Sequence, residues 1–226
     1  MKTIGLIGGM SWQSTMHYYQ IINEYIEQEL GGFHSAKILM YSVDFDKIER
    51  NQREGNWEEV ARLISFAAQS LERGGADFIL ICTNTIHKVY QTIQESVSIP
   101  ILHIADATMQ ALSCKKVALL GTKYTMTEDF YKSRLEESGF EVLIPKKADM
   151  EYINTVIFEE LCKGIVKKES AQGFYRIIED LKKEGAQGVI LGCTEIGMLI
   201  EKRQACLPLY DTTYIHAITG AKMALE

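Results

Sequence analysis

An internal repeat constrains the fold of this chain more than any other feature of the sequence. The segment GGADFILICTNTIH, from Gly74 to His87, resembles EGAQGVILGCTEIG, from Glu184 to Gly197. Each copy has a Gly-Ala turn, an apolar stretch typical of a buried strand, and a polar segment after it. In this register Thr83 corresponds to Cys193, so two equivalent strand ends carry side chains with a transferable proton.

A second pair of segments supports a duplication. KTIGLIGG, from Lys2, corresponds to KKVALLGT, from Lys115, and this register aligns Gly8 with Gly121. Apolar strands can resemble one another by convergence, but the matching turns and polar strand ends favour a common origin. We therefore expect two related domains rather than one large core.

The apolar and polar pattern predicts alternating strands and helices in both halves. The expected strands are 4–7, 36–43, 78–81, 101–104, 117–120, 142–144 and 189–191, and the expected helices are 14–30, 57–73, 127–138, 152–163, 170–183 and 214–225. Such alternation is typical of parallel sheets. It predicts an α/β fold with two pseudo-symmetric domains, each a parallel sheet flanked by helices, and an active site in the cleft between them.

Two similar proline-containing segments predict where the chain crosses between the domains. They are IPILHIADAT, from Ile99, and LPLYDTTYIHA, from Leu207, and each begins with an extended X-Pro unit. The first domain is then expected to comprise 1–104 and 208–226, and the second 105–207. The charged segment 44–57 is expected to be a loop that can close over the site.

The composition argues against several classes of protein. The chain has 226 residues, of which 46% are hydrophobic, and a formal net charge of −6, which disfavours a nucleic-acid partner. No apolar stretch reaches the roughly 18 residues of a membrane span, and the N-terminus lacks a signal-peptide core, so we expect a cytoplasmic protein without a membrane partner. The 5 cysteines show no CxxC spacing, which predicts reduced thiols and no metal.

Polar residues follow the predicted strand ends in both halves. Helix N-termini at such ends can bind a small carboxylate through free N–H groups. A single Ser or Thr there is explained by helix capping, but clustering in both halves favours a ligand. GLIGGM is not GxGxxG, which argues against a dinucleotide.

Cys193 differs from the other cysteines because it ends a predicted strand. A helix starting just after it predicts a lowered thiol pKa and a role as base or nucleophile. If a pseudo-twofold axis relates the domains, Thr83 faces Cys193, and the two side chains approach one molecule from both sides, as inversion at a carbon requires.

At these residues the sequence resembles the aspartate/glutamate racemase family. The matching motifs are IGLIGGMSW from Ile4, NQ at Asn51, CTNTIH from Cys82, ELxKG from Glu160, GCTE from Gly192 and YDTTYIHA from Tyr210. The resemblance implies a homodimeric enzyme that uses neither pyridoxal phosphate nor a metal and acts on a small amino-acid substrate. It implies Thr83 and Cys193 as the catalytic residues. The substrate-binding residues that it implies are Met10, Gln52, Asn84, Thr85, Lys163, Thr194 and Glu195.

The first motif departs from the usual family pattern. Family members typically have a cysteine directly before Asn-Thr, whereas Thr83 occupies that position here and Cys82 lies one residue earlier. Alternation along a strand turns Cys82 to the opposite face. The pattern therefore resembles a racemase subgroup with a Thr/Cys pair.

Two alternatives remain open. One is a malonate decarboxylase or maleate isomerase on the same scaffold. The other is a protein that binds and senses an acidic amino acid without turnover, because Thr83 replaces a thiol. In each reading an acidic ligand needs a cation, for which we expect Lys163, with Lys47, Arg50 and Arg53 as further candidates.

Overall fold

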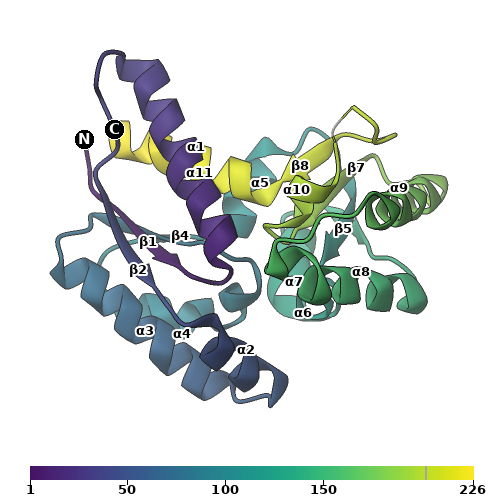
Figure 1. The fold of residues 1–226 in the computed structure, drawn as a ribbon, viewed down its shortest axis with the longest axis horizontal. Helices are drawn as coiled ribbons and strands as arrows, with labels where there is room; N and C mark the ends of the chain where they lie inside the picture. The colour runs from purple at the N-terminus through teal and green to yellow at the C-terminus, as the bar shows by residue number, and fades with distance from the viewer. Residues whose placement is uncertain (202) are drawn as a thin grey trace. The chain divides into compact units, whose positions relative to one another are not determined.

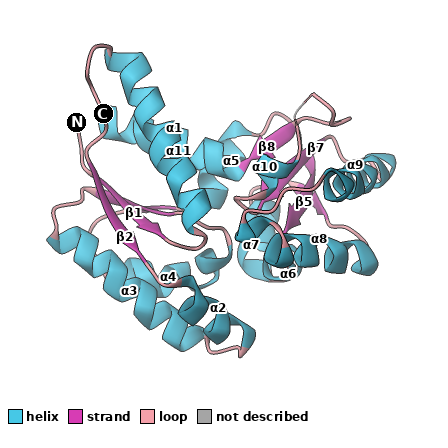
Figure 2. Ribbon diagram, viewed as in Figure 1, coloured by secondary structure: helices cyan, strands magenta, loops and turns pink. Residues whose placement is uncertain are grey.

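The computed structural model describes residues 1–201 and 203–226 and divides the chain into two compact units. The first unit comprises Met1–Ala107 and Thr213–Glu226, and the second comprises Thr108–Thr212. Each contains a four-stranded parallel sheet with helices packed against it (Figures 1 and 2). The predicted α/β fold with two parallel sheets is therefore confirmed.

The sheet of the first unit has the order β2-β1-β3-β4. Its strands are β1 (Ile4–Gly8), β2 (Ile38–Ser42), β3 (Phe78–Ile81) and β4 (Ile101–Leu102). All residues of β1 and β3 are buried, which explains why these strands read as continuous apolar stretches. The register pairs Ile7 with Ile81, so the carboxyl ends of β1 and β3 lie at the same edge.

Helices cover both faces of this sheet. They are α1 (Trp12–Leu30), α2 (Phe45–Arg53), α3 (Trp57–Arg73), α4 (Tyr90–Glu95) and α11 (Thr212–Leu225), with a 3₁₀ helix η1 (Thr85–Val89). The helix α5 (Ile104–Ala111) begins in the first unit and ends in the second. Side chains alternate along the strands. Leu80 packs with α1 and α11, whereas Ile79 and Ile81 pack with α3. Figure 1 shows α1 and α11 on one face of the sheet and α3 on the other. Two separate core clusters result, one on each side of the sheet.

The sheet of the second unit has the equivalent order, β6-β5-β7-β8. Its strands are β5 (Lys116–Gly121), β6 (Glu141–Leu143), β7 (Gly188–Gly192) and β8 (Leu209–Asp211). Its helices are α6 (Lys123–Thr127), α7 (Asp129–Glu137), α8 (Lys147–Glu159), α9 (Lys168–Lys183) and α10 (Ile196–Leu199), with a 3₁₀ helix η2 (Leu161–Lys163). The strands β3 and β7, which precede Thr83 and Cys193, occupy the same place in the two sheets, as the repeat predicts.

Several expected elements differ from the structure. The segment 44–57, expected to be a loop, contains the helix α2. Asp44 caps this helix, and two ion pairs lie along it, Asp46–Arg50 and Glu49–Arg53. The expected helix 127–138 begins at Asp129 and ends at Glu137, because the chain is extended at Glu128 (ψ 154°), which separates it from α6. The expected helix 152–163 begins at Lys147 and ends at Glu159.

The ends of the inserted unit also differ from expectation. The segment 101–104 contributes only two residues to β4, and α5 follows at Ile104. The strand β8 pairs with β7, so the chain returns to the first unit at Thr213 rather than near Pro208.

Candidate active-site residues at the strand ends

The turn between β1 and α1 is held by a short network around Thr15. Gly9 has φ +93°, and a Cβ there would collide with the Val43 carbonyl, so only glycine fits. Gly9 N–H donates to Thr15 Oγ1 (2.9 Å), and Thr15 Oγ1 donates to the Ser11 carbonyl (2.9 Å). Ser11 caps α1 through Ser14 N–H (3.4 Å). The backbone at this edge of the sheet is therefore firmly positioned.

Met10 and Gln52 both lie close to the core on this side of the first unit. Met10 is 4% exposed, packs in the cluster that contains Ile48 of α2, and is joined to Ser11 by a cis peptide. Gln52 follows Ile48 by one helical turn and is 5% exposed. The side chain of Met10 therefore contributes mainly to packing, whereas Gln52 brings a polar group to a buried position.

The end of β3 carries the first predicted catalytic residue. Cys82 N–H still bonds to the Ile7 carbonyl (3.0 Å), but Thr83 N–H turns back to the Ile81 carbonyl (2.8 Å), which ends the strand. Cys82 is completely buried in the cluster beneath α1 and α11, and this burial raises the pKa of its thiol. Thr83 is partly buried, and Asn84 and Thr85, which follow it, are 2% and 7% exposed.

The equivalent edge of the second unit is formed by β5 and β7. Gly121 pairs with Gly192, and a Cβ on Gly121 would lie 2.7 Å from the Gly192 carbonyl oxygen. Thr122 caps α6 by accepting from Thr125 N–H (3.3 Å). The close approach of the two strands places Thr122 and Cys193 at the same edge of the sheet.

Cys193 is hydrogen-bonded to a buried carboxylate. Its Sγ donates to Glu195 Oε2 at 3.1 Å, and Thr194 Oγ1 donates to the same oxygen at 2.8 Å. Glu195 is 2% exposed and Cys193 7% exposed. Two hydrogen bonds thus orient one carboxylate oxygen toward the thiol.

The prediction that the Cys193 thiol has a lowered pKa is wrong. Burial raises its pKa well above the ordinary value, and the negative charge of Glu195 and the neighbouring Cys162 raise it further. The helix α10 is only 4 residues long, and its N-terminal charge does not offset these effects. The resting form of Cys193 is therefore the thiol.

Cys162 is a member of this group that sequence reasoning missed. Burial raises the pKa of its thiol, and the charge of Glu195 raises it further. It lies in η2, more than thirty residues before Cys193, and packs against the same core cluster. The motif ELxKG, which contains Cys162, was the available signal, but its relation to Glu195 depends on tertiary packing.

Three of the four cations expected to bind an acidic ligand pair with carboxylates. Lys163 Nζ lies 2.6 Å from Glu159 Oε2, with more than half of each side chain exposed. Arg50 pairs with Asp46 at 2.7 Å and Arg53 with Glu49 at 3.6 Å, both at the surface of α2. Lys47 lines a small cavity of about 180 Å³ beside the end of β2, together with Asp44 and Phe66. These exposed pairs are weak enough to exchange partners.

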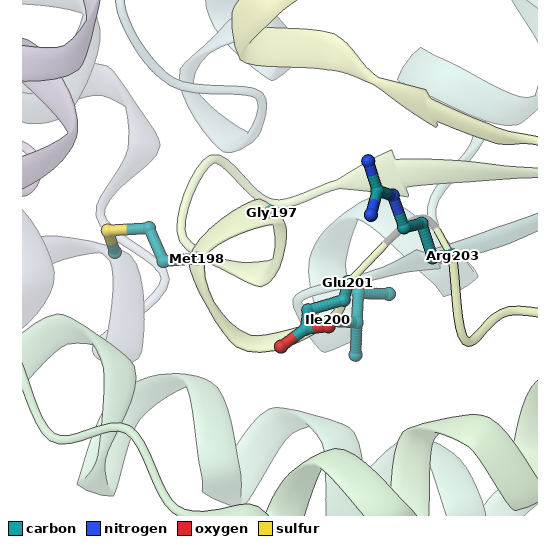
Figure 3. Close-up of a pocket in the computed structure, with 5 residues that line it drawn as sticks. All are labelled: Gly197, Met198, Ile200, Glu201 and Arg203. Atoms are coloured by element: carbon teal, nitrogen blue, oxygen red, sulfur yellow. The ribbon is translucent and has the colours of Figure 1, made fainter.

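Two larger cavities lie beside α10 in the second unit. One, of about 480 Å³, is lined by Gly197, Met198, Ile200, Glu201 and Arg203, with Met198 and Arg203 at opposite ends of this set (Figure 3). The other, of about 520 Å³, shares Met198 and Glu201 and reaches Lys167 and Lys168. Neither lining includes Cys193.

Within the described ranges 1–201 and 203–226, no cluster of three metal-ligating side chains occurs. None of the helices described is both long enough and apolar enough to cross a bilayer.

Comparison with known proteins gives one consistent result. Residues 7–219 match the family model described as Asp/Glu/Hydantoin racemase. The chain is 26% identical over 215 residues, 93% of its length and 92% of the relative's, to the broad-specificity amino-acid racemase RacX of Bacillus subtilis (strain 168). Two crystal structures are similar over 100% of both chains: a candidate Asp/Glu racemase from Yersinia pestis (49% identity, TM-score 0.92) and an aspartate racemase homologue from Pyrococcus horikoshii OT3 (36% identity, TM-score 0.87).

Proposed function

Because the chain belongs to the Asp/Glu/Hydantoin racemase family, we propose that it racemises an acidic amino acid, aspartate, glutamate or both. In this proposal Cys193 and Thr83 exchange the Cα proton on opposite faces of the substrate. The observation that carries it is the hydrogen bond from Cys193 Sγ to Glu195 Oε2 (3.1 Å). A thiol whose pKa is raised is seldom ionised. It can become a thiolate base only where a group that accepts its proton is already in place.

The first step forms the base. Glu195 takes the thiol proton of Cys193, and the resulting thiolate removes the Cα proton of the substrate. Thr194 donates to the same Glu195 oxygen and keeps it directed at Cys193. Burial of Cys193 and Glu195 excludes water, which would otherwise compete for the thiolate.

The second step returns a proton to the opposite face. The Thr83 hydroxyl gives its proton to the carbanion and is then reprotonated from solvent, so the substrate leaves with inverted configuration. Cys193 keeps the proton that it took from Cα, and Glu195 releases to solvent the proton that it took from Cys193, which restores the starting state. Backbone N–H groups at the strand ends are suited to stabilise the negative charge of the intermediate. Because an alcohol is a much weaker acid than a thiol, proton transfers at Thr83 are the slower ones.

Binding roles are proposed for the remaining strand-end residues. Asn84, Thr85 and Gln52 bring buried polar side chains to the first unit's edge. Lys163 exchanges Glu159 for the side-chain carboxylate of the substrate. Met10 contributes its backbone, because its side chain is packed in the core.

The proposed enzyme works without pyridoxal phosphate, as a cytoplasmic homodimer. Native mass spectrometry checks the dimer, and turnover by protein from which cofactors have been dialysed checks the cofactor expectation.

Solvent deuterium exchange tests the proposed activity. L- and D-glutamate and aspartate are incubated with the protein in D₂O, and Cα deuterium and configuration are followed by NMR. Deuterium in the inverted product supports racemisation. Tight binding without exchange identifies an amino-acid-binding protein, and loss of a carboxyl group from a malonate substrate identifies a decarboxylase.

A further inference from the structure

The imidazole of His87 bridges two backbone groups of the first unit. His87 Nδ1 lies 2.9 Å from the Thr83 carbonyl oxygen, and Ile104 N–H donates to His87 Nε2 at 3.3 Å. A carbonyl can only accept and a backbone N–H can only donate, so the neutral ring carries its proton on Nδ1. His87 therefore donates to Thr83 and accepts from Ile104.

The His87 ring is buried among neighbouring rings. It is 2% exposed, its centroid lies 4.5 Å from that of His103, and it stacks on Tyr90 at 6.2 Å with an interplanar angle of 12°. His103 Nδ1 accepts from Ala105 N–H (3.1 Å), so its position is also fixed. These rings fill the space around His87, and its orientation is set by the hydrogen bonds to the Thr83 carbonyl and Ile104 N–H.

A third histidine, His216, completes the cluster. Its Nε2 donates to the Leu102 carbonyl (3.0 Å), which leaves Nδ1 to accept from Tyr18 Oη (2.9 Å). Burial, followed by the proximity of His87, lowers its pKa to about 3. His216 is therefore uncharged at neutral pH.

The hydrogen bond from His87 acts on the backbone that directs the Thr83 side chain. Thr83 N–H is bonded to the Ile81 carbonyl and its own carbonyl is bonded to His87, so both peptide groups of Thr83 are fixed. Within the described part of the chain, the Thr83 hydroxyl itself has no hydrogen bond. The two backbone hydrogen bonds therefore fix the Cα–Cβ bond of Thr83, from which the hydroxyl extends.

We infer that His87 is a positioning residue for the proposed racemase reaction: by holding the Thr83 carbonyl it aims the Thr83 hydroxyl at the substrate Cα. Misplacement of a reacting group by about 1 Å can lower a rate by roughly 10²-fold. Loss of the His87 hydrogen bond should therefore slow proton transfer at Thr83 and leave proton transfer at Cys193 largely intact.

The inference rests on the proposed function and is tested with paired variants in D₂O. His87→Leu removes both ring nitrogens, whereas His87→Asn keeps an N–H donor attached to Cγ, where Nδ1 was. His103→Leu perturbs the same ring cluster without touching the Thr83 carbonyl. Two rates are measured for each variant. The first is inversion, which needs Thr83. The second is Cα exchange without inversion, which Cys193 supports and which is measured after Thr83→Ala has been added to the variant.

We expect His87→Leu to lower inversion by roughly 10- to 100-fold while Cys193-dependent exchange changes by less than about threefold. His87→Asn should recover much of the inversion, and His103→Leu should affect both rates little. In the Thr83→Ala background, His87→Leu should cause no further loss. Equal loss of both rates in His87→Leu, or the same loss in His103→Leu, overturns the inference and assigns the cluster a purely structural role. A wild-type protein without exchange or inversion would instead overturn the proposed function.

Discussion

Cys193 donates its thiol proton to the carboxylate of Glu195 across 3.1 Å, and both residues are buried. The pair lies directly after the central strand β7, at the place where Thr83 follows β3 in the first unit. A buried thiol with a raised pKa and a carboxylate acceptor resembles an acid–base pair prepared for substrate, rather than a preformed thiolate.

Replacing Glu195 by Gln should separate its two effects on Cys193. The kcat for racemisation is expected to fall by roughly 10²- to 10⁴-fold, because the acceptor for the thiol proton is lost. The pKa of Cys193 should nevertheless fall, since the neighbouring negative charge is removed. Alkylation of Cys193 by iodoacetamide as a function of pH measures this pKa. Glu201→Gln is the matched control, and unchanged kcat in Glu195→Gln would exclude the role in proton transfer.

The buried His216 predicts the acid sensitivity of the fold. Its pKa is lowered to about 3 in the folded protein, compared with the ordinary value of 6.5. Below about pH 6.5 the unfolded chain binds a proton at His216 that the folded protein does not bind. The free energy of unfolding is therefore highest above about pH 6.5 and falls as the pH decreases toward 3. Complete titration corresponds to roughly 4 to 5 kcal/mol as an upper bound.

Urea unfolding between pH 7 and pH 4 measures this loss of stability. In His216→Gln, which keeps a donor and an acceptor but does not titrate, the acid-dependent loss should be smaller. The same slope in wild type and variant would show that other groups cause the acid sensitivity.

Lys163 should contribute to substrate binding rather than to chemistry. Its surface pair with Glu159 is worth at most about 1 kcal/mol, so a dicarboxylate substrate can displace Glu159. Lys163→Ala is expected to raise KM for glutamate or aspartate roughly tenfold, about 1.4 kcal/mol, with a smaller change in kcat. Glu159→Ala frees Lys163 and should leave KM equal or lower. A Lys163→Ala variant with unchanged KM would show that another cation binds the substrate carboxylate.

The Thr/Cys pair predicts different maximal rates in the two directions. The enantiomers have equal free energy in water, so kcat/KM is equal in both directions, but kcat need not be. We expect the larger kcat for the enantiomer whose Cα proton is taken by Cys193. Thr83→Cys should raise the smaller kcat, because a thiol transfers a proton more readily than an alcohol. Initial rates measured by polarimetry from each pure enantiomer give both values, and equal values in wild type would argue against unequal partners.

The two sheets could be predicted because parallel strands that are buried on both faces appear in the sequence as apolar stretches. The internal repeat indicated that the two sheets are equivalent. The sequence did not predict α2, because only Ile48 and Gln52 of that helix are buried and its other residues resemble a charged loop. The helix α2 was missed because its sequence has little hydrophobic periodicity.

The candidate site was predicted in part. Its strand ends were identified from the sequence, because polar residues follow β1, β3, β5 and β7. The pKa of Cys193 was predicted in the wrong direction, because its burial depends on packing with distant η2. The His87 bridge was also missed, since Ile104, one of its two partners, lies 17 residues further along the chain.

The most direct test of the account measures deuterium at Cα and configuration together for wild type, Thr83→Ala and Cys193→Ala. Wild type should give inverted product labelled with deuterium. Thr83→Ala should stop inversion but retain exchange in one enantiomer only, and Cys193→Ala should abolish that exchange. Inversion by Cys193→Ala, or inversion by Thr83→Ala at the wild-type rate, would contradict the proposal that these two residues act on opposite faces of one substrate.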